Sequence, residues 1–251
     1  MGTPVERLDS MVAFLRLLAV CWVLMAVSSG RSQETCIPSH ETYDLNANGI
    51  PRFVQSDYIE LGKIERISRF RSGVGHDYSD GFESCRSMKH YFQPSNTVNW
   101  ASIQIRSPVA GIVSRLEQES LAGGGIQMRI KSRDFPAFCF ILFHVRTNGL
   151  VAVGDSVSAG QLLGTHIGNQ STSDIAVGVS TPTGWRLLSY FDVMSDSMFA
   201  TYQARGINSR TDAIISKEAR DADPLTCNRG RLAGPGNLTN WVMLWSPKTG
   251  C

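Results

Sequence analysis

The feature that most constrains this chain is a series of short apolar segments separated by glycine turns between residues 107 and 179. Residues 107–113, Ser-Pro-Val-Ala-Gly-Ile-Val, form a turn followed by a β-branched segment. Residues 125–131 alternate apolar with polar, as in a strand with one wet face, whereas 138–145 are continuously apolar, as in a strand buried on both faces. Residues 151–164 place two glycine turns around a short strand. This spacing predicts a mainly β sandwich or barrel, not βαβ units.

Short helices are expected around the β region. A helix is predicted over residues 192–202, ending before Gly206 and presenting an apolar stripe of Phe191, Met194, Met198 and Tyr202. A second helix is predicted near residues 216–222. Leu61, Ile64 and Ile67 have helical spacing and predict a short helix within residues 57–70. The tail from residue 228 onward is rich in Gly, Pro and Asn and is expected to be irregular, with its tryptophans docking on the domain.

The N-terminal residues predict export. Arg7 and Arg16 precede an apolar run at residues 17–27 that is too short to span a bilayer comfortably, and small residues follow it at 26–30. We interpret residues 1–32 as a secretory signal peptide, with an uncleaved N-terminal anchor as the alternative. The mature chain is then expected to be secreted or periplasmic, with no stable membrane span.

Five cysteines remain after the predicted cleavage: Cys36, Cys85, Cys139, Cys227 and Cys251. Export permits disulfides, and an odd number leaves one thiol free or paired between chains. Cys139 lies inside the apolar run and is predicted to be a buried thiol, while the pairing of the other four stays open. No cysteine pair has zinc-ribbon spacing, so a structural zinc knuckle is not expected.

Composition and missing motifs exclude several functions. The 251 residues are 42% hydrophobic and 18% charged. The formal net charge of +2 is too small to indicate binding to nucleic acid. The sequence contains no nucleophile elbow, phosphate loop or dinucleotide fingerprint. A lipoyl or biotinyl carrier needs a lysine at a hairpin tip, and the only Met-Lys pair, Met88-Lys89, lies far upstream.

A possible calcium loop begins at Asp44. Asp44, Asn46 and Asn48, followed by Gly49, match the first half of an Asp-x-Asn-x-Asn-Gly loop, whose alternating oxygens can converge on a hard cation. The twelfth position is Gln55 and lacks the bidentate glutamate of such loops. The alternative is a turn in which Asp and Asn cap their own backbone.

Four motifs in one order resemble the lysostaphin/LytM-type zinc endopeptidases. They are Ser-Pro-Val-Ala-Gly-Ile-Val at 107–113, Phe-His-Val at 143–145, Val-Gly-Asp-Ser-Val-Ser-Ala-Gly-Gln-Leu-Leu-Gly at 153–164 and Gly-Asn-Gln-Ser-Thr at 168–172. The resemblance covers residues 76 to 179 and neither end, and the Gly-Asp-x-Val-x-x-Gly-Gln part also occurs in carrier domains and secretion adaptors. It implies the duplicated hybrid motif, a β-sandwich or barrel with short peripheral helices.

The resemblance also implies a zinc site. His76 and Asp80 have the His-x-x-x-Asp spacing that supplies two ligands in that family, and His144 occupies the position of a catalytic histidine that polarises the scissile carbonyl. The alternatives are a solvated polar loop for His76 and Asp80, and a strand-end histidine for His144.

This sequence departs from the family at the closing His-x-His motif. Asp174 stands where the catalytic histidine is expected, and Ala176 stands at the position of the third ligand. Alanine binds no metal, and two protein ligands leave a zinc site weak. Asp174, which shares a strand face with position 176, is the best substitute ligand, ahead of His90 and His166. The expected metal set is therefore His76, Asp80 and Asp174, with His144 and Asp174 as catalytic candidates.

Two functions follow from the resemblance. The favoured hypothesis is a non-catalytic module of the cell envelope that binds peptidoglycan or a partner protein. The alternative is an active metal-dependent peptidoglycan endopeptidase that uses the substitute ligand. We expect a signal peptide at 1–32, an extension at 33–70, the lysostaphin-like β domain at 71–190 and a helical or irregular extension at 191–251.

Overall fold

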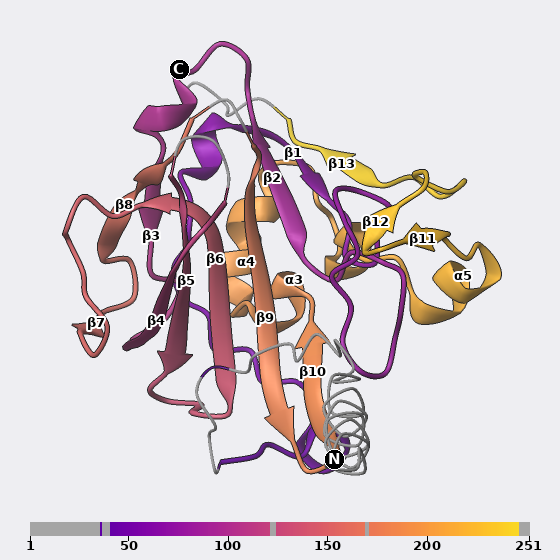
Figure 1. Ribbon diagram of the computed structural model, residues 1–251, viewed down its shortest axis with the longest axis horizontal. Helices are drawn as coiled ribbons and strands as arrows, with labels where there is room; N and C mark the ends of the chain where they lie inside the picture. The colour runs from indigo at the N-terminus through magenta and orange to yellow at the C-terminus, as the bar shows by residue number, and fades with distance from the viewer. Residues whose placement is uncertain (1–35, 37–40, 121–123, 169–170, 246–251) are drawn as a thin grey trace, which may run out of the picture. The chain divides into compact units, whose positions relative to one another are not determined.

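The computed structural model describes residue 36 and residues 41–120, 124–168 and 171–245, and their fold is mainly antiparallel β (Figure 1). The prediction of a mainly β chain with short helices is confirmed. The principal sheet has the strand order β13-β1-β2-β9-β6-β5-β4-β7, with β10 beside β9 and the β3–β8 pair beside β6. Residues 1–32, the predicted signal peptide, lie outside the described residues.

The strands of this sheet are β1 (Ile64–Ser68), β2 (His90–Pro94), β3 (Gln104–Arg106), β4 (Gly111–Gln118), β5 (Ile126–Ser132), β6 (Phe138–Arg146), β7 (Ser156–Val157), β8 (Leu162–His166), β9 (Ser173–Thr181), β10 (Gly184–Leu188) and β13 (Trp241–Met243). A separate hairpin pairs β11 (Cys227–Asn228) with β12 (Arg231–Leu232). The helices are α2 (Leu45–Asn48), α3 (Tyr190–Val193), α4 (Asp196–Gln203) and α5 (Lys217–Ala222), with 3-10 turns at Leu61–Lys63, Trp100–Ser102 and Arg210–Ala213.

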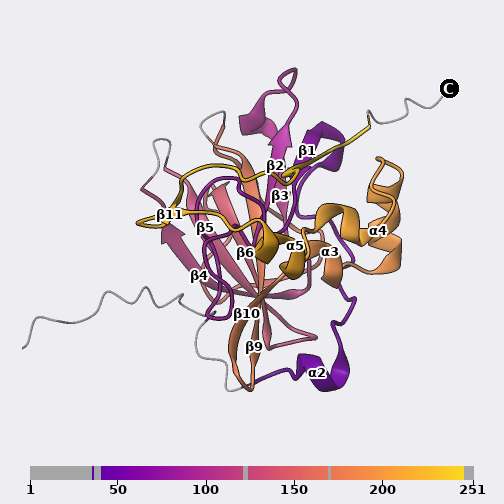
Figure 2. The same ribbon diagram turned by 90° about the vertical axis from the view of Figure 1, so that its right-hand side faces the viewer.

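Strand β9 lies at the centre of the sheet and is buried on both faces. Its first residues pair with β2, its later residues pair with β10, and β6 runs along its other side. Ile175, Val177 and Val179 join the main apolar core, against which α3 and α4 pack on one side of the sheet (Figure 2). The alternate residues Asp174 and Ala176 face the opposite side. There a smaller core gathers under the loops, and its members include Phe70, Met88, Ile141 and Phe143.

The predicted helices are confirmed in part. The helix over 192–202 is two helices, because Met194 and Ser195 adopt extended backbone between α3 and α4 and Ser195 caps the second. Helix α5 begins after its cap Ser216, as predicted. The helix predicted within 57–70 is wrong: after one 3-10 turn the chain enters β1, whose Ile64 and Ile67 lie in the main core.

Both predicted extensions contribute to the sheet. Strand β1, from residues 33–70, pairs with β2 and with β13, which comes from residues 191–251. The expectation of an irregular tail is therefore wrong for Trp241–Met243. The described residues all belong to one compact unit. Among the described residues, no helix is long and apolar enough to cross a membrane.

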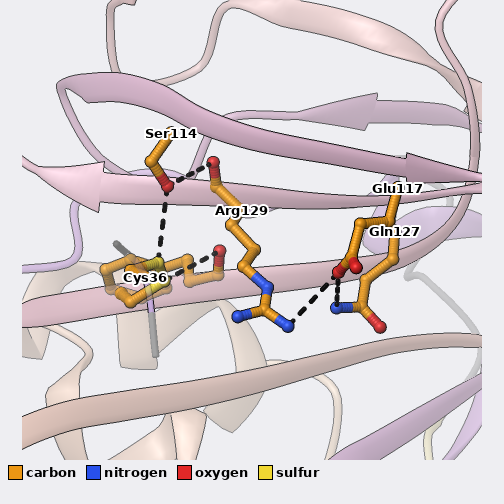
Figure 3. The surroundings of a disulfide bond; sticks show 7 residues. Cys36, Ser114, Glu117, Gln127 and Arg129 are labelled. Atoms are coloured by element: carbon orange, nitrogen blue, oxygen red, sulfur yellow. Dashed lines mark hydrogen bonds and ion pairs between the residues drawn. A yellow bond between two sulfur atoms is a disulfide. The ribbon is translucent and has the colours of Figure 1, made fainter. Parts of the chain in front are cut away.

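Two disulfides link distant parts of the chain, Cys36 to Cys139 and Cys85 to Cys227. Cys139 is buried as predicted, but it is paired, so the prediction of a buried free thiol is wrong. Figure 3 shows Cys36 beside Ser114, a residue of β4 whose hydroxyl donates to the Cys36 sulfur at 3.5 Å. Cys251 lies outside the described residues.

Candidate functional site

A cluster of buried charged side chains lies on the face of the sheet that carries Asp174. Its members are Lys89, Asp174, His144 and Glu119, with His76 at the exposed rim. Lys89 is 2% exposed and Asp174 fully buried, so these charges are stabilised by one another and not by water. We take this cluster as the candidate site and call it the charged centre.

The first contact of the charged centre is an ion pair between Lys89 and Asp174. The Lys89 Nζ donates to Asp174 Oδ2. Tyr91 of β2 pairs directly with Asp174 of β9, and Lys89, two residues before Tyr91, shares its face. The ammonium also lies 4.0 Å from the ring centroid of Phe143 and 4.8 Å from that of Tyr91, where cation–π attraction adds to the ion pair.

His144 enters the charged centre from a bulge in β6. The register between β5 and β6 shifts by one residue between Leu142 and Val145, and His144 adopts a φ of 60°, a rare conformation for a residue with a side chain. The bulge turns the imidazole toward β9, so that its Nε2 lies 3.1 Å from Asp174 Oδ1.

Glu119, just after β4, holds the other side of this imidazole. Its Oε2 lies 2.7 Å from His144 Nδ1 and also accepts the His144 backbone N–H at 3.1 Å. Gly125 makes this approach possible, because a Cβ there would lie 2.6 Å from Glu119 Oε2 and 3.2 Å from His144 Cα. Both ring nitrogens of His144 therefore face carboxylates.

His76 lies at the exposed rim of the charged centre. Its Nε2 is 3.3 Å from Lys89 Nζ, and its Nδ1 is 2.9 Å from the carbonyl oxygen of Asp77. The preceding Gly75 has a φ of 75°, and a Cβ there would lie 2.1 Å from the Tyr91 hydroxyl. A glycine is thus required for the loop to bring His76 over Lys89.

The charges in the centre support one another. Burial raises the pKa of Asp174, but Lys89 and His144 outweigh burial and hold it below its usual value. Burial lowers the pKa of His144, but its contacts with Asp174 and Glu119 raise it to about 9. Burial likewise opposes the charge of Lys89, yet the Asp174 carboxylate raises its pKa above the ordinary value. At neutral pH Lys89 and His144 are therefore cations and Asp174 is an anion.

Asp80, the predicted second metal ligand, is committed elsewhere. Its Oδ1 accepts the backbone N–H groups of Phe82 and Glu83 at 2.8 and 3.0 Å, and its Oδ2 accepts that of Leu187 at 3.0 Å. It lines a separate cavity of about 210 Å³ at the β9–β10 hairpin, whose lining includes none of the residues of the charged centre. Asp80 fixes a turn against β10.

The predicted metal set does not assemble. Within the described part of the chain, no three His, Cys, Asp or Glu side chains are arranged to hold a metal ion. His76 and Asp174 do approach one point, but Lys89 Nζ occupies it. The residues present therefore do not fit a zinc ion bound by His76, Asp80 and Asp174.

The two other candidate ligands, His90 and His166, are both buried and neither belongs to the ion pairs of the charged centre. His90 points to the opposite face, where its Nδ1 lies 2.8 Å from Ser68 O and its Nε2 lies 2.9 Å from Ser189 Oγ. Burial lowers its pKa to about 4. His166 is fully buried; burial and, next, the charge of His144 lower its pKa to about 4 as well.

The calcium hypothesis is not supported at Asp44. Its Oδ1 accepts the backbone N–H groups of Asn46 and Ala47 at 2.9 and 3.1 Å and so caps helix α2, and the Asn48 side chain bonds back to Asp44 O. Gly49 ends the helix with a φ of 69°. The alternative, a turn that caps its own backbone, describes this segment.

Sequence reasoning found His76, His144 and Asp174 but missed Lys89 and Glu119. The signal for Lys89 was its alternation with Tyr91 across a segment of otherwise buried residues. A lysine in an apolar strand face must have a buried anion as partner. Nothing local marked Glu119, because its role depends on the bulge that turns His144.

Comparisons with known proteins give partial likenesses of structure. Neither a protein-family model nor a curated protein matches the chain. A LytM protein from Ruminococcus gnavus, described as a glycyl-glycine endopeptidase, aligns with 42% of this chain and 43% of its own at 18% identity and a TM-score of 0.31. The catalytic domain of lysostaphin from Staphylococcus simulans aligns with 44% of this chain and 80% of its own at 20% identity and a TM-score of 0.31.

A third likeness is to CbpA from L. salivarius, over 32% of this chain and 50% of that protein, at 17% identity and a TM-score of 0.24. The chain thus spans half or less of the length of two of these three structures. The solved structures that resemble it include peptidase domains of the LytM and lysostaphin type.

Proposed function

We propose that this chain is an exported module of the cell envelope that binds peptidoglycan or an envelope protein without hydrolysing it. The observation that carries the proposal is the position of the Lys89 ammonium, between Asp174 and His76, where a hydrolase of the resembled family needs a metal ion. A catalytic metal keeps an open position for water, whereas an ammonium has no coordination position to offer.

The state of His144 supports the same conclusion. A histidine that acts as a general base needs an unprotonated nitrogen facing its substrate. Both ring nitrogens of His144 face carboxylates, and those carboxylates raise its pKa to about 9, so the ring is an imidazolium at neutral pH. It is a fixed cation that holds Glu119 and Asp174 in place.

The cell-envelope setting has two supports. The motifs at residues 107–172 resemble enzymes of cell-wall peptides, which suggests peptidoglycan as the ligand class. Disulfides persist in oxidising compartments, and the described residues form two that join positions 103 and 142 residues apart in the sequence. A secreted or periplasmic location, reached through the proposed signal peptide, is consistent with both a cell-wall ligand and stable disulfides.

A metal-dependent endopeptidase is the competing function. It requires Asp174 to exchange Lys89 for a metal ion and Asp80 to release three backbone N–H groups. Each exchange leaves a buried charge or donor unpaired, which disfavours this function.

The test is a wall-binding assay with the mature protein, residues 33–251. Purified peptidoglycan is incubated with the protein, sedimented and assayed for both bound protein and released fragments. We expect retention on the pellet with no release of fragments, and the same retention for His76→Ala. Solubilisation of the wall that disappears in His76→Ala would contradict the proposal. A protein that neither sediments nor releases fragments would redirect the search to protein partners of the envelope.

A further inference from the structure

The small side chain of Ala176 on β9 complements the long side chain of Lys89. The β2–β9 ladder ends at the pair His90 and Ile175, and its register, extended by one residue, directs Lys89 toward Ala176. Directly opposed residues of antiparallel strands share a face, with Cβ atoms about 4.5–5.5 Å apart. Ala176 is 1% exposed and pairs with Ile141 of β6, so protein encloses its side chain. Ala176 contributes only a methyl group to the face on which Lys89 meets Asp174.

Lys89 supplies the positive charge that the buried Asp174 carboxylate requires. The Lys89 ammonium already lies against the Asp174 carboxylate, and His144 lies between Asp174 and Glu119. A divalent metal added beside Lys89 would bring two surplus positive charges into a space that excludes water, at a large cost in free energy. A metal ion and the lysine therefore exclude each other.

The contacts around Nζ are those of a cation site. Asp174 Oδ2 on β9 and His76 Nε2 on its loop converge on it, and three aromatic rings lie around it, those of Phe143, Tyr91 and Tyr78. A carboxylate oxygen and an imidazole nitrogen are donors that divalent transition metals accept. The ammonium fills a position to which two suitable ligands already point.

We propose that Lys89 is a built-in cation seated in a latent divalent-metal site, and that Lys89 and Ala176 form a matched pair that keeps the metal out. This inference rests on the proposed function and explains it, because it names the residue that replaces the metal ion. Removal of the lysine alone frees two ligands, Asp174 and His76. A histidine at position 176, on the same face as Asp174, adds a third ligand beside them.

The test uses Co²⁺, which reports tetrahedral coordination by visible absorption, and Zn²⁺ as its competitor. Four proteins are titrated: the wild type, Ala176→His, Lys89→Ala and the double variant Lys89→Ala with Ala176→His. We expect no absorption band for the wild type or for Ala176→His, weak binding for Lys89→Ala, and at least tenfold tighter, stoichiometric binding for the double variant. Circular dichroism confirms that each protein is folded.

Two results would overturn the inference. One is metal binding by Ala176→His as tight as that of the double variant, which would mean that the lysine keeps nothing out. The other is a folded double variant that binds no metal. A measurement on the wild type is independent of folding in the variants: the nitrogen-15 signal of the Lys89 ammonium should be unchanged by excess Zn²⁺, and its loss would also overturn the inference. None of these readouts depends on wall binding, so failure here is distinguishable from failure of the proposed function.

Discussion

The two faces of β9 are built on opposite principles. On one face Ile175, Val177 and Val179 pack into the main core, where any apolar side chain of similar volume satisfies the same requirement. On the other face Asp174 is held by two named partners, Lys89 and His144, and each of the three is buried. The apolar face determines the fold through burial, and the polar face determines a single arrangement through pairing. Their responses to substitution should therefore differ.

The largest effect is expected from Asp174→Ala. The change leaves the Lys89 ammonium buried without its anion and removes one of the two carboxylates that hold His144. Breaking a buried pair from one side costs about 3–5 kcal/mol of unfolding free energy. Chemical denaturation measures the loss, with the neighbour Ile175→Val on the apolar face as the matched control, for which we expect about 0.5–1.5 kcal/mol. Equal losses at the two positions would remove the distinction between the faces.

The double variant Lys89→Met with Asp174→Leu should be more stable than Asp174→Ala alone. Both buried charges are replaced by apolar groups of similar volume, so no charge of the pair is left uncompensated. We expect it to recover about 2 kcal/mol of what Asp174→Ala loses, as judged from the same denaturation curves. A double variant no more stable than Asp174→Ala would show that the unpaired Lys89 charge is not what makes Asp174→Ala costly.

The charged centre should make stability depend on pH between about 6.5 and 9. The pKa of His144 is raised from an unfolded value of about 6.5 to about 9, so its contribution is fully present below pH 6.5 and is lost as the pH rises through 9. The unfolding free energy should fall across this window, and His144→Gln should flatten the slope. A wild-type profile that is flat from pH 6.5 to 9 would contradict the protonated imidazole.

The smallest effect is expected at an ion pair with similar contacts but free access to water. Lys217 and Asp221 form a pair on α5, with side chains 51% and 41% exposed. Lys217→Ala should change the unfolding free energy by about 0.5 kcal/mol or less, because water screens such pairs. A loss of unfolding free energy as large as that of Asp174→Ala would show that burial does not explain the large contribution of the charged centre to stability.

The sequence predicted the apolar half of this molecule better than the polar half. Strand periodicity located β5 and β6 within one residue, because burial of one or both faces imposes the pattern locally, but of β4 it located only the start. It failed at β1, where Ile64 and Ile67 at helical spacing also fit a strand whose register with β2 shifts at that point. Pairing with β2 and β13 decided that segment, and this long-range contact leaves no local signal.

The candidate site shows the same division. Position in a motif was enough to single out His144 and Asp174, which the structure brings to 3.1 Å. The motif also singled out Asp80, which instead caps a turn, because spacing does not reveal which donors an oxygen faces. Alternation with Tyr91 marks Lys89 as a residue in need of a buried anion, but it does not reveal that the anion is Asp174 on another strand.

The central claim is that an ammonium takes the place of a metal ion in the charged centre. The most direct test is the metal content of the mature wild-type protein, purified without chelators and measured by elemental analysis. We predict no stoichiometric zinc, manganese or other transition metal in a protein that is folded. One metal ion per chain, lost in Asp174→Asn and present while Lys89 is intact, would contradict the account.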